Sequence, residues 1–225
     1  MMTHFPAKLD VDYVPVEAEP LHKQRWRTET MRLVVVDFPP QTKCLYHQHL
    51  KYGVYLVMTP INMMEYPYGE EPRRLVHGKG SVFCRDHTKD KLIHSGATFD
   101  EPAFLIEVEL LKEKADVMPN GHLPLHPGIK LYNNNPECRV YGFTLQDDDQ
   151  AIAKISLDLP TEAVLVALDV CEVKITKASN NKQEDTTHRV LLRVGDDVQL
   201  IAGKFGVELV SSASKKAQFI LVEVY

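Results

Sequence analysis

The sequence lacks the features that mark several large classes of protein. Its 225 residues hold no block of lysine and arginine dense enough to follow a phosphate backbone, and the formal net charge is −5. No apolar run approaches the roughly 20 residues that a membrane-spanning helix needs. The sequence therefore predicts neither a nucleic-acid partner nor a membrane partner.

Motifs of the common nucleotide-binding and acyl-transfer enzymes are also missing. The chain has no GxSxG nucleophile elbow, no GxxxxGK[ST] phosphate loop and no GxGxxG dinucleotide fingerprint. Any chemistry must therefore come from a different arrangement of side chains.

Cysteine is scarce, and no two cysteines form a CxxC motif. This argues against a zinc ribbon or a CxxC redox pair and favours a reduced, intracellular protein. The first residues, MMTHFPAKLDVDYVPVE, lack the apolar core of a signal peptide because Lys8, Asp10 and Asp12 interrupt it. We therefore expect a cytoplasmic location. The simplest interpretation of each cysteine is that it is a small residue of the core. The four cysteines are Cys44, Cys84, Cys138 and Cys171.

Short apolar or alternating runs are what the sequence does contain. Glycine, proline or charged turns bound them, and such punctuation at close spacing favours the strands of a sandwich or barrel over helices. The clearest runs cover residues 31–38 (MRLVVVDF), 54–66 (VYLVMTPINMMEY), 81–84 (SVFC) and 103–111 (AFLIEVELL). Residues 17–29 fit either a helix or an extended lead-in, and both interpretations stay open.

The alternation within residues 103–111 indicates a half-buried strand. Its apolar side chains, from Phe104 to Leu110, share one face, whereas Glu107 and Glu109 point to the other. A helix would not separate them in this way. We therefore expect the apolar face, and not the two carboxylates, to meet the core.

The second half of the chain repeats the first in outline. RLVVVDFPP (32–40) corresponds to CRVYGFTLQ (138–146), and EPAFLIEVEL (101–110) corresponds to KAQFILVEV (216–224). The offsets lie between about 107 and 115 residues, which indicates a duplicated unit and not a short solenoid repeat. Residues 115–137 hold four prolines and no regular period. We therefore expect an N-terminal domain (1–114), a linker (115–137) and a C-terminal domain (138–225).

These motifs resemble those of a known family. A His-x-His at residues 47–49 enters an apolar strand, and GSVFCRDHTKDKLIHSGATFDEPAFLIEVEL (80–110) follows it. Together they resemble the two conserved motifs of the cupin superfamily, and residues 194–224 resemble the second motif again. The resemblance covers roughly residues 30–112 and 138–225. It implies an all-β bicupin, in which two small antiparallel, jelly-roll-like β-barrels follow each other in one chain.

The resemblance implies a metal site around His47 and His49. Side chains alternate along a strand, so both imidazoles point the same way, about 7 Å apart. The family usually adds a glutamate four or five residues later, but this position falls on Gly53 or Val54. A different strand therefore has to supply the carboxylate.

The family's third histidine aligns with Asp90, and His94 lies just beyond it. Asp90, Leu92 and His94 share parity, so if one faces the interior, all three should. The predicted metal ligands are His47, His49, Asp90 and His94. Two other readings stay open: a histidine pair can be solvated or structural, and a charged turn such as DHTKDK usually faces solvent.

The C-terminal half shows no counterpart of this site. Lys154 and Ser156 fall near the positions of the histidine pair, Gly206 falls near that of the third ligand, and His188 stands alone on another segment. We predict no metal there and a packing or dimerising role. In the N-terminal half, His77 and His87 are expected at the surface.

The first functional hypothesis is a metal-dependent cupin that acts on a small polar organic molecule. Two histidines and one carboxylate form the ligand set of non-haem Fe(II) oxygenases, which favours Fe²⁺ and a dioxygenase-like oxidoreductase, with an isomerase or lyase next. If His94 joins the set, Zn²⁺, Mn²⁺ or Ni²⁺ fits equally well. The predicted substrate-binding residues are Tyr55, Arg85 and Phe104. Arg85 could grip a substrate carboxylate, or it could simply pair with Asp90.

The second hypothesis is a bicupin without metal or catalysis that binds a small molecule or serves as a structural unit. The missing glutamate favours it, and the fold alone does not decide between the two. A homodimer is expected under both hypotheses, because antiparallel barrels often expose strand edges that pair or pack.

Overall fold

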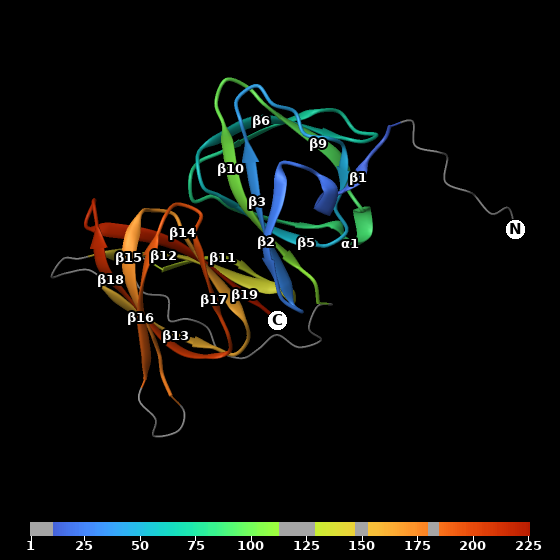
Figure 1. Cartoon of the computed structure of the whole chain (residues 1–225). Helices are drawn as coiled ribbons and strands as arrows, with labels where there is room; N and C mark the ends of the chain where they lie inside the picture. Colours follow the sequence, from blue (N-terminus) through green and yellow to red (C-terminus); the bar gives the residue numbers. More distant parts are fainter. Residues whose placement is uncertain (1–10, 113–128, 147–152, 180–184) are drawn as a thin grey trace, which may run out of the picture.

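A computed structural model describes residues 11–112, 129–146, 153–179 and 185–225 (Figure 1). Strands make up nearly all the regular structure in these ranges, which confirms the predicted all-β class. The two helices described are the short 3₁₀ turn η1 (Val16–Ala18) and α1 (His87–Asp90). Neither is long or apolar enough to cross a membrane.

Ten strands of the first half form two five-stranded sheets, which we call the N-terminal unit. The outer N sheet has the order β1 (Val14–Pro15), β4 (His47–Gln48), β9 (Ile93–Thr98), β6 (Ile61–Pro67) and β7 (Arg73–His77). The inner N sheet has the order β2 (His22–Arg27), β3 (Met31–Phe38), β10 (Ala103–Leu110), β5 (Tyr52–Val57) and β8 (Val82–Asp86). All of these strand pairs are antiparallel except β1 with β4.

The second half repeats this arrangement as the C-terminal unit. Its inner C sheet has the order β11 (Ile129–Asn134), β12 (Cys138–Gln146), β19 (Lys216–Val224), β14 (Ala163–Ala167) and β17 (Asp197–Leu200). Its outer C sheet has the order β13 (Lys154–Leu159), β18 (Gly203–Ser212), β15 (Cys171–Lys177) and β16 (Thr186–Leu192). The duplication expected from the sequence is therefore visible in the strand order.

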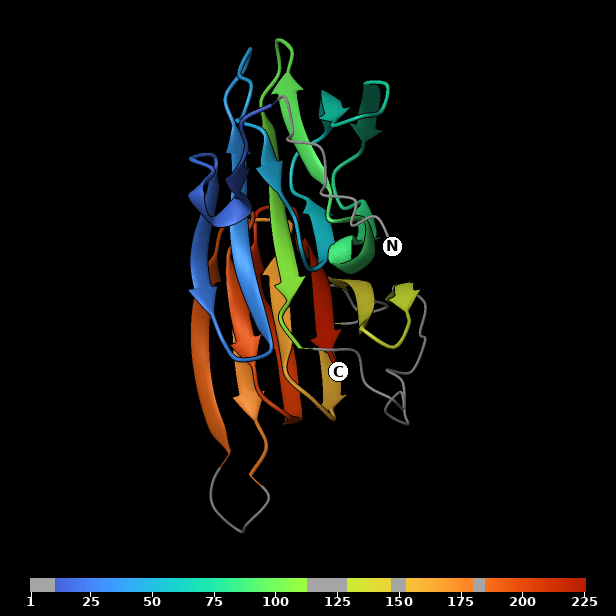
Figure 2. The same cartoon turned by 90° about the vertical axis from the view of Figure 1, so that its right-hand side faces the viewer.

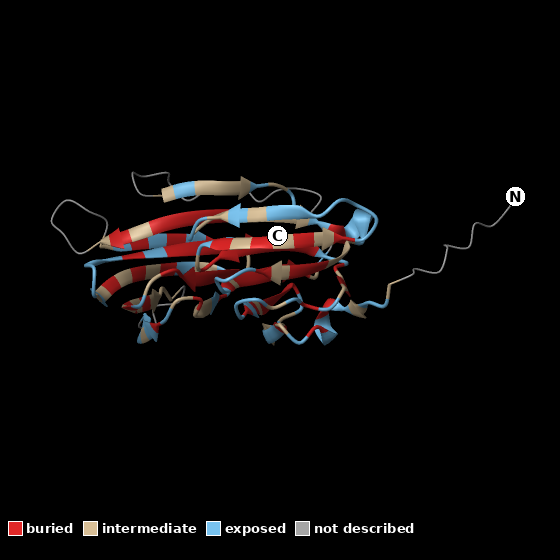
Figure 3. Cartoon of the chain, turned by 90° about the horizontal axis from the view of Figure 1, so that it is seen from above, coloured by how far each residue is buried: buried red, intermediate tan, exposed pale blue. Residues whose placement is uncertain are grey.

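The two inner sheets pack against each other and join the units through one apolar cluster. Side chains from β3, β5 and β10 meet side chains from β12, β14 and β19 in this cluster. Figure 2 shows the blue to green strands of the first unit in front of the orange and red strands of the second. The buried residues accordingly concentrate on the central strands, as Figure 3 shows.

This packing buries both faces of β10. Ile106 and Val108 point toward the C-terminal unit and are fully buried in the shared cluster. Glu107 and Glu109 point into the N-terminal unit and are 0% and 1% exposed. The predicted alternation of apolar and acidic side chains along this strand is correct. The expectation that the carboxylates face away from the core is wrong, because the C-terminal unit covers the apolar face and the opposite face lies inside the N-terminal unit.

Other segments differ from expectation in smaller ways. The run at residues 54–66 is two strands, β5 and β6, and not one. Residues 17–29 form no α-helix: the end of η1 and the strand β2 (His22–Arg27) lie in this stretch, which favours the extended lead-in. Strand β11 begins at Ile129, inside the segment expected as linker, while residues 113–128 lie outside the described ranges.

Candidate functional site

Histidines from three strands gather at one end of the N-terminal unit's interior. His47 lies on β4, directly opposite His94 on β9. His49 follows two residues later, and its backbone N–H donates to the Leu92 carbonyl, which keeps it beside the strand pair. His22, at the start of β2, arrives from the inner N sheet. Strand register and alternation therefore bring the neighbouring pair His47 and His49 together with His22 and His94, which are distant in sequence.

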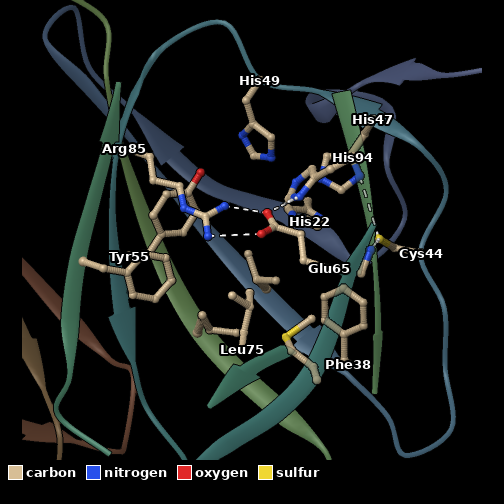
Figure 4. Close-up of a pocket in the computed structure, with 15 residues that line it drawn as sticks. His22, Phe38, Cys44, His47, His49, Tyr55, Glu65, Leu75, Arg85 and His94 are labelled. Carbon is tan, nitrogen blue, oxygen red and sulfur yellow. Dashed lines mark hydrogen bonds and ion pairs between the residues drawn. The ribbon is translucent and has the colours of Figure 1, made fainter. Parts of the chain in front are cut away.

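His47 stands at the centre of this group (Figure 4). Its ring centroid lies 4.4 Å from that of His22, 4.9 Å from that of His49 and 4.6 Å from that of His94. His22, His47 and His49 each offer a ligand atom within 4.8 Å of the others, a grouping that could hold a metal ion. His94 adjoins it, with its centroid 5.0 Å from that of His49.

Three of the four imidazoles are held from behind through Nδ1. The Nδ1 of His22 lies 2.7 Å from Glu19 Oε2, and that of His47 lies 2.9 Å from the Leu45 carbonyl oxygen. The Nδ1 of His94 lies 2.7 Å from Glu65 Oε1.

His49 differs: its Nδ1 lies at an ion-pair distance of 3.3 Å from Glu107 Oε1, but neither this nitrogen nor the Glu107 oxygens make a hydrogen bond within the described residues. Outer acceptors such as those of the other three rings orient the histidines of metal sites and leave Nε2 for the metal. The Nε2 atoms of His47, His49 and His94 are buried and have no hydrogen-bond partner among the described residues. Buried polar atoms without partners are costly, so these donors fit a bound cation.

The pKa values separate His47 and His94 from His49. Burial, together with the neighbouring imidazoles, lowers the pKa of His47 to about 2. Burial also lowers the pKa of His94 to about 4, although Glu65 opposes it. Both rings are therefore neutral at pH 7, with a nitrogen lone pair available.

His49 behaves in the opposite way. Burial alone would lower its pKa, but the charges of Glu107 and Glu109 outweigh this and raise it to about 9. Burial alone would raise the pKa of Glu107, yet His49 lowers it to about 2. At pH 7 an imidazolium and a carboxylate thus form a buried ion pair.

Carboxylates that the sequence analysis did not assign to the site stand behind the imidazoles. Glu65 is 1% exposed and accepts hydrogen bonds from His94, Arg85 and Arg73, which hold its pKa low although burial would raise it. Glu109 lies opposite Gly53 in the β10–β5 ladder, and Arg32 donates to it. A neighbouring strand therefore supplies acidic groups where β5 lacks one.

Gly53 cannot simply be replaced by a longer residue at this place. A Cβ atom there would lie 2.9 Å from the Tyr55 ring, because that ring folds back over the glycine. One sequence signal could have located these acidic groups, namely the Glu-x-Glu alternation in β10. It would have done so only if both faces of this strand had been expected to be buried.

Asp90 does not lie with the histidines. It ends α1, its side chain is 58% exposed, and one of its carboxylate oxygens lies 3.1 Å from His87 Nδ1. Strand β9 starts only at Ile93, after Lys91 has adopted a left-handed backbone with φ 49°. The prediction that the side chains of Asp90 and His94 point the same way is therefore wrong, because side chains alternate only within a strand.

His87 is buried, contrary to the expectation of a surface position. It is 2% exposed, and its ring centroid lies 5.3 Å from that of His49. Its Nε2 lies 3.4 Å from Tyr55 Oη. His77 ends β7 and stacks on Phe83, with centroids 4.9 Å apart.

A cavity of about 60 Å³ opens beside the imidazoles (Figure 4). Of the three predicted substrate-binding residues, Tyr55 and Arg85 line it. Phe104 does not: it packs against the apolar cluster between the units. Arg85 donates from both terminal nitrogens to Glu65, so its partner is neither Asp90 nor a free carboxylate. The rest of the wall is mostly apolar and includes Val36, Phe38, Met63, Leu75, Phe83 and Leu105.

The interior of the C-terminal unit is apolar where the N-terminal unit is polar. Ile155, Leu157 and Val207 are buried in its core, and Leu221 stands in the ladder where Glu107 stands in β10. The Arg–Glu pair is retained, with Arg139 opposite Glu223 as Arg32 is opposite Glu109. The retained pair belongs to the duplicated scaffold, whereas the imidazole cluster described here belongs to the first unit.

No protein-family profile matches the chain, and no curated protein matches it. Solved structures do. The cupin 2 conserved barrel domain protein from Leptotrichia buccalis aligns with a TM-score of 0.54 at 12% identity, over 91% of this chain and 88% of that one. An oxalate decarboxylase formate complex from Lactobacillus farciminis gives 0.61 at 10% identity, over 87% and 77%.

AerE from Microcystis aeruginosa gives a TM-score of 0.56 at 11% identity, over 92% of this chain and 98% of that one. At such low identity the likeness concerns the fold alone. It confirms the predicted architecture: the chain has a bicupin fold.

Proposed function

We propose that the N-terminal unit binds a divalent transition-metal ion and acts as a metal-dependent enzyme on a small polar organic molecule. The observation that carries the proposal is the set of four clustered imidazoles from His22, His47, His49 and His94. Three of them are held at Nδ1 by an acceptor behind the ring, and Nδ1 of His49 lies at an ion-pair distance from Glu107. In three of them Nε2 is buried without a partner among the described residues.

The ligand set bears on the choice of metal. The sequence-based preference for Fe²⁺ depended on Asp90 as the carboxylate ligand, and Asp90 lies outside the cavity. Imidazole ligands suit Zn²⁺, Cu²⁺, Fe²⁺ and Ni²⁺. Glu19, Glu65 and Glu107 act behind the imidazoles, where they set ring orientation and raise ligand basicity.

The cavity restricts what can reach the imidazoles. An apolar cavity of about 150 Å³ accommodates benzene, so the roughly 60 Å³ here admits a smaller molecule or one group of a larger molecule. The structurally similar oxalate decarboxylase was solved with formate, and a carboxylate of that size fits this limit.

For a site loaded with a redox-active ion such as Fe²⁺ or Cu²⁺, we propose a dioxygenase-like oxidation. A bound metal would supply Lewis-acid or O₂ chemistry. The chain's own contribution is a small, mostly apolar wall that includes Phe38 and Leu105 and disfavours water. Tyr55 also lines this space, and burial, together with Glu107, raises the pKa of its hydroxyl well above the ordinary value, so the hydroxyl stays protonated at neutral pH.

A bicupin without metal is the second candidate, and two contacts favour it. The charges of His49 and Glu107 satisfy each other without a metal ion. Both terminal nitrogens of the Arg85 guanidinium already donate to Glu65, so this group is not available for a bidentate contact with an anionic substrate.

Metal analysis distinguishes the two candidates. Protein purified without chelator is expected to carry close to one equivalent of a transition metal, measured by inductively coupled plasma mass spectrometry. The double variant His47→Ala/His49→Ala should retain less than a tenth of it. His188→Ala, which removes an exposed histidine of the C-terminal unit, is the matched control and should retain all of it. Metal-free wild-type protein that also fails to take up Zn²⁺, Ni²⁺, Cu²⁺ or Fe²⁺ would leave the metal-free candidate.

Asp90→Asn tests whether the exposed carboxylate contributes to the site. Its side chain is 58% exposed and contacts His87 and not the four imidazoles. We expect metal content and metal affinity within twofold of wild type, measured by titration calorimetry with Zn²⁺. A tenfold loss of affinity would instead place Asp90 among the ligands.

A further inference from the structure

Two glutamates of β10 face the Nδ1 atom of His49. Glu107 Oε1 lies 3.3 Å from this nitrogen, and Glu109 Oε1 lies 3.6 Å from it. The three residues each offer a ligand atom within 4.8 Å of the others, which makes a second grouping that could hold a metal ion. This grouping shares only His49 with the four imidazoles, so it is a separate set of ligand atoms.

The two distances match the spacing of ligands around one ion. The Nδ1 of His49, both carboxylate oxygens of Glu107 and Oε1 of Glu109 are buried, and none has a hydrogen-bond partner among the described residues. Two ligands that lie about 2.0–2.2 Å from a tetrahedral Zn²⁺ ion are roughly 3.3–3.6 Å from each other. The nitrogen and the two oxygens are therefore spaced as they would be across a shared cation.

The C-terminal unit shows which of these carboxylates the scaffold requires. Glu223 takes the place of Glu109 in the ladder, and each of the two lies opposite an arginine. Leu221 takes the place of Glu107. The duplicated fold thus accepts an apolar side chain at this position. The carboxylate of Glu107, which is 0% exposed, is therefore not needed for folding and points to a ligand in the unit that also holds the imidazoles.

Glu109 is held in the way that a metal-binding carboxylate usually is. Arg32 donates from Nε to Glu109 Oε2, which leaves Oε1 for His49. Carboxylates that bind metals are commonly fixed by such a hydrogen bond from behind. Arg32 in turn reaches Glu17, whose side chain is 55% exposed, so solvent lies one residue beyond this pair.

We propose that a second metal ion binds between Nδ1 of His49 and the carboxylates of Glu107 and Glu109. The two nitrogens of an imidazole ring point in diverging directions, so His49 binds the ion of the four-imidazole site through Nε2 and the second ion through Nδ1. The ring releases the protons of both nitrogens to solvent and bridges the two ions as an imidazolate. The bridge rests on the proposed function, because it requires the first ion.

The ligand set favours Zn²⁺ or Cu²⁺ at the second position. Both ions accept imidazole nitrogen together with carboxylate oxygen. The second ion has to displace the remaining ring proton of His49 and to share Glu109 with Arg32. We therefore expect it to bind more weakly than the first ion and to enter when metal is added to the purified protein.

Equilibrium dialysis of the full chain against excess Zn²⁺ counts the ions. We expect two equivalents per chain for wild type, measured by inductively coupled plasma mass spectrometry. Glu107→Gln should bind one equivalent, and so should His47→Ala, which affects only the first ion. Glu101→Gln removes an exposed charge and should bind two. Glu107→Leu, which copies Leu221 of the C-terminal unit, repeats the test with an apolar side chain that the scaffold accepts.

Cu²⁺ tests the bridge directly through electron paramagnetic resonance. The first equivalent should give the signal of one unpaired spin per chain. An imidazolate couples two Cu²⁺ ions antiferromagnetically, so the second equivalent should reduce the signal at liquid-helium temperature. In Glu107→Gln the signal of the first ion should remain.

The outcomes separate this inference from the proposed function. A single Zn²⁺ ion that His47→Ala removes and Glu107→Gln retains would overturn the second site and leave the four-imidazole site intact. Wild-type protein that binds no Zn²⁺ would overturn both. Two Zn²⁺ ions that persist in both Glu107→Gln and Glu107→Leu, or a Cu²⁺ signal that doubles with the second equivalent, would overturn the bridged pair.

Discussion

Arg32→Met is expected to lower the free energy of unfolding by about 3–5 kcal/mol, the usual cost of removing one partner of a buried ion pair. The Arg32 side chain is 2% exposed and donates to Glu109 from Nε, and its Nη1 lies 2.7 Å from Glu17 Oε1. Without it, the buried carboxylate of Glu109 would lose the guanidinium that donates to it. Urea unfolding followed by circular dichroism measures the loss.

The control and the rescue make this result specific. Arg74→Met removes an exposed arginine whose Nε donates to Asn62 on the surface, and its cost should stay within about 0.5 kcal/mol. Adding Glu109→Gln to Arg32→Met should recover a large part of the stability, because the uncompensated charge is then gone. If Arg32→Met cost no more than Arg74→Met, the interior charges of the N-terminal unit would not be coupled as described.

Metal binding is expected to release about one proton per ion near pH 7, and the apparent affinity should rise about tenfold per pH unit between pH 6 and 8. In the metal-free protein the pKa of His49 is raised to about 9, so its ring carries a proton over this whole range. A metal that binds His49 has to displace that proton. His47 and His94, with pKa values of about 2 and 4, are already deprotonated and add nothing to the slope. Above about pH 9 the dependence should flatten.

Calorimetric titration with Zn²⁺ in buffers of different ionisation enthalpy counts the released protons. Glu107→Gln removes the charge that contributes most to the raised pKa of His49. We therefore expect the variant to release well under half a proton at pH 7.5. Glu71→Gln, a change at an exposed position, should release as many protons as wild type. Equal proton release in Glu107→Gln and wild type would show that the pair does not govern binding.

The resemblance in sequence predicted the fold well because the fold depends on local patterns. Alternation and turn residues located β3, β8 and β10 to within a residue or two. The repeat between the halves indicated a duplicated unit, and the order of the strands in the sheets shows the duplication, with four strands in the outer C sheet and five in the outer N sheet. Such patterns are readable because side-chain direction in a strand repeats every two residues.

Only part of the candidate site could be predicted from the sequence. His47 and His49 could be paired by alternation, since they are neighbours on one short strand and its continuation. His22 could not be, because β2 lies on the opposite sheet and no local pattern links it to β4. Asp90 was misplaced because α1 intervenes before β9 and breaks the alternation.

The sequence by itself determined which residues share a face of each strand, that the chain is duplicated, and that two histidines point the same way. Only the tertiary structure decided what covers each face. The C-terminal unit packs on Ile106 and Val108, so the opposite face of β10 becomes an interior wall and places Glu107 beside His49. The physical reason is that alternation is a property of one strand, whereas burial and charge pairing depend on which strands and sheets pack against it.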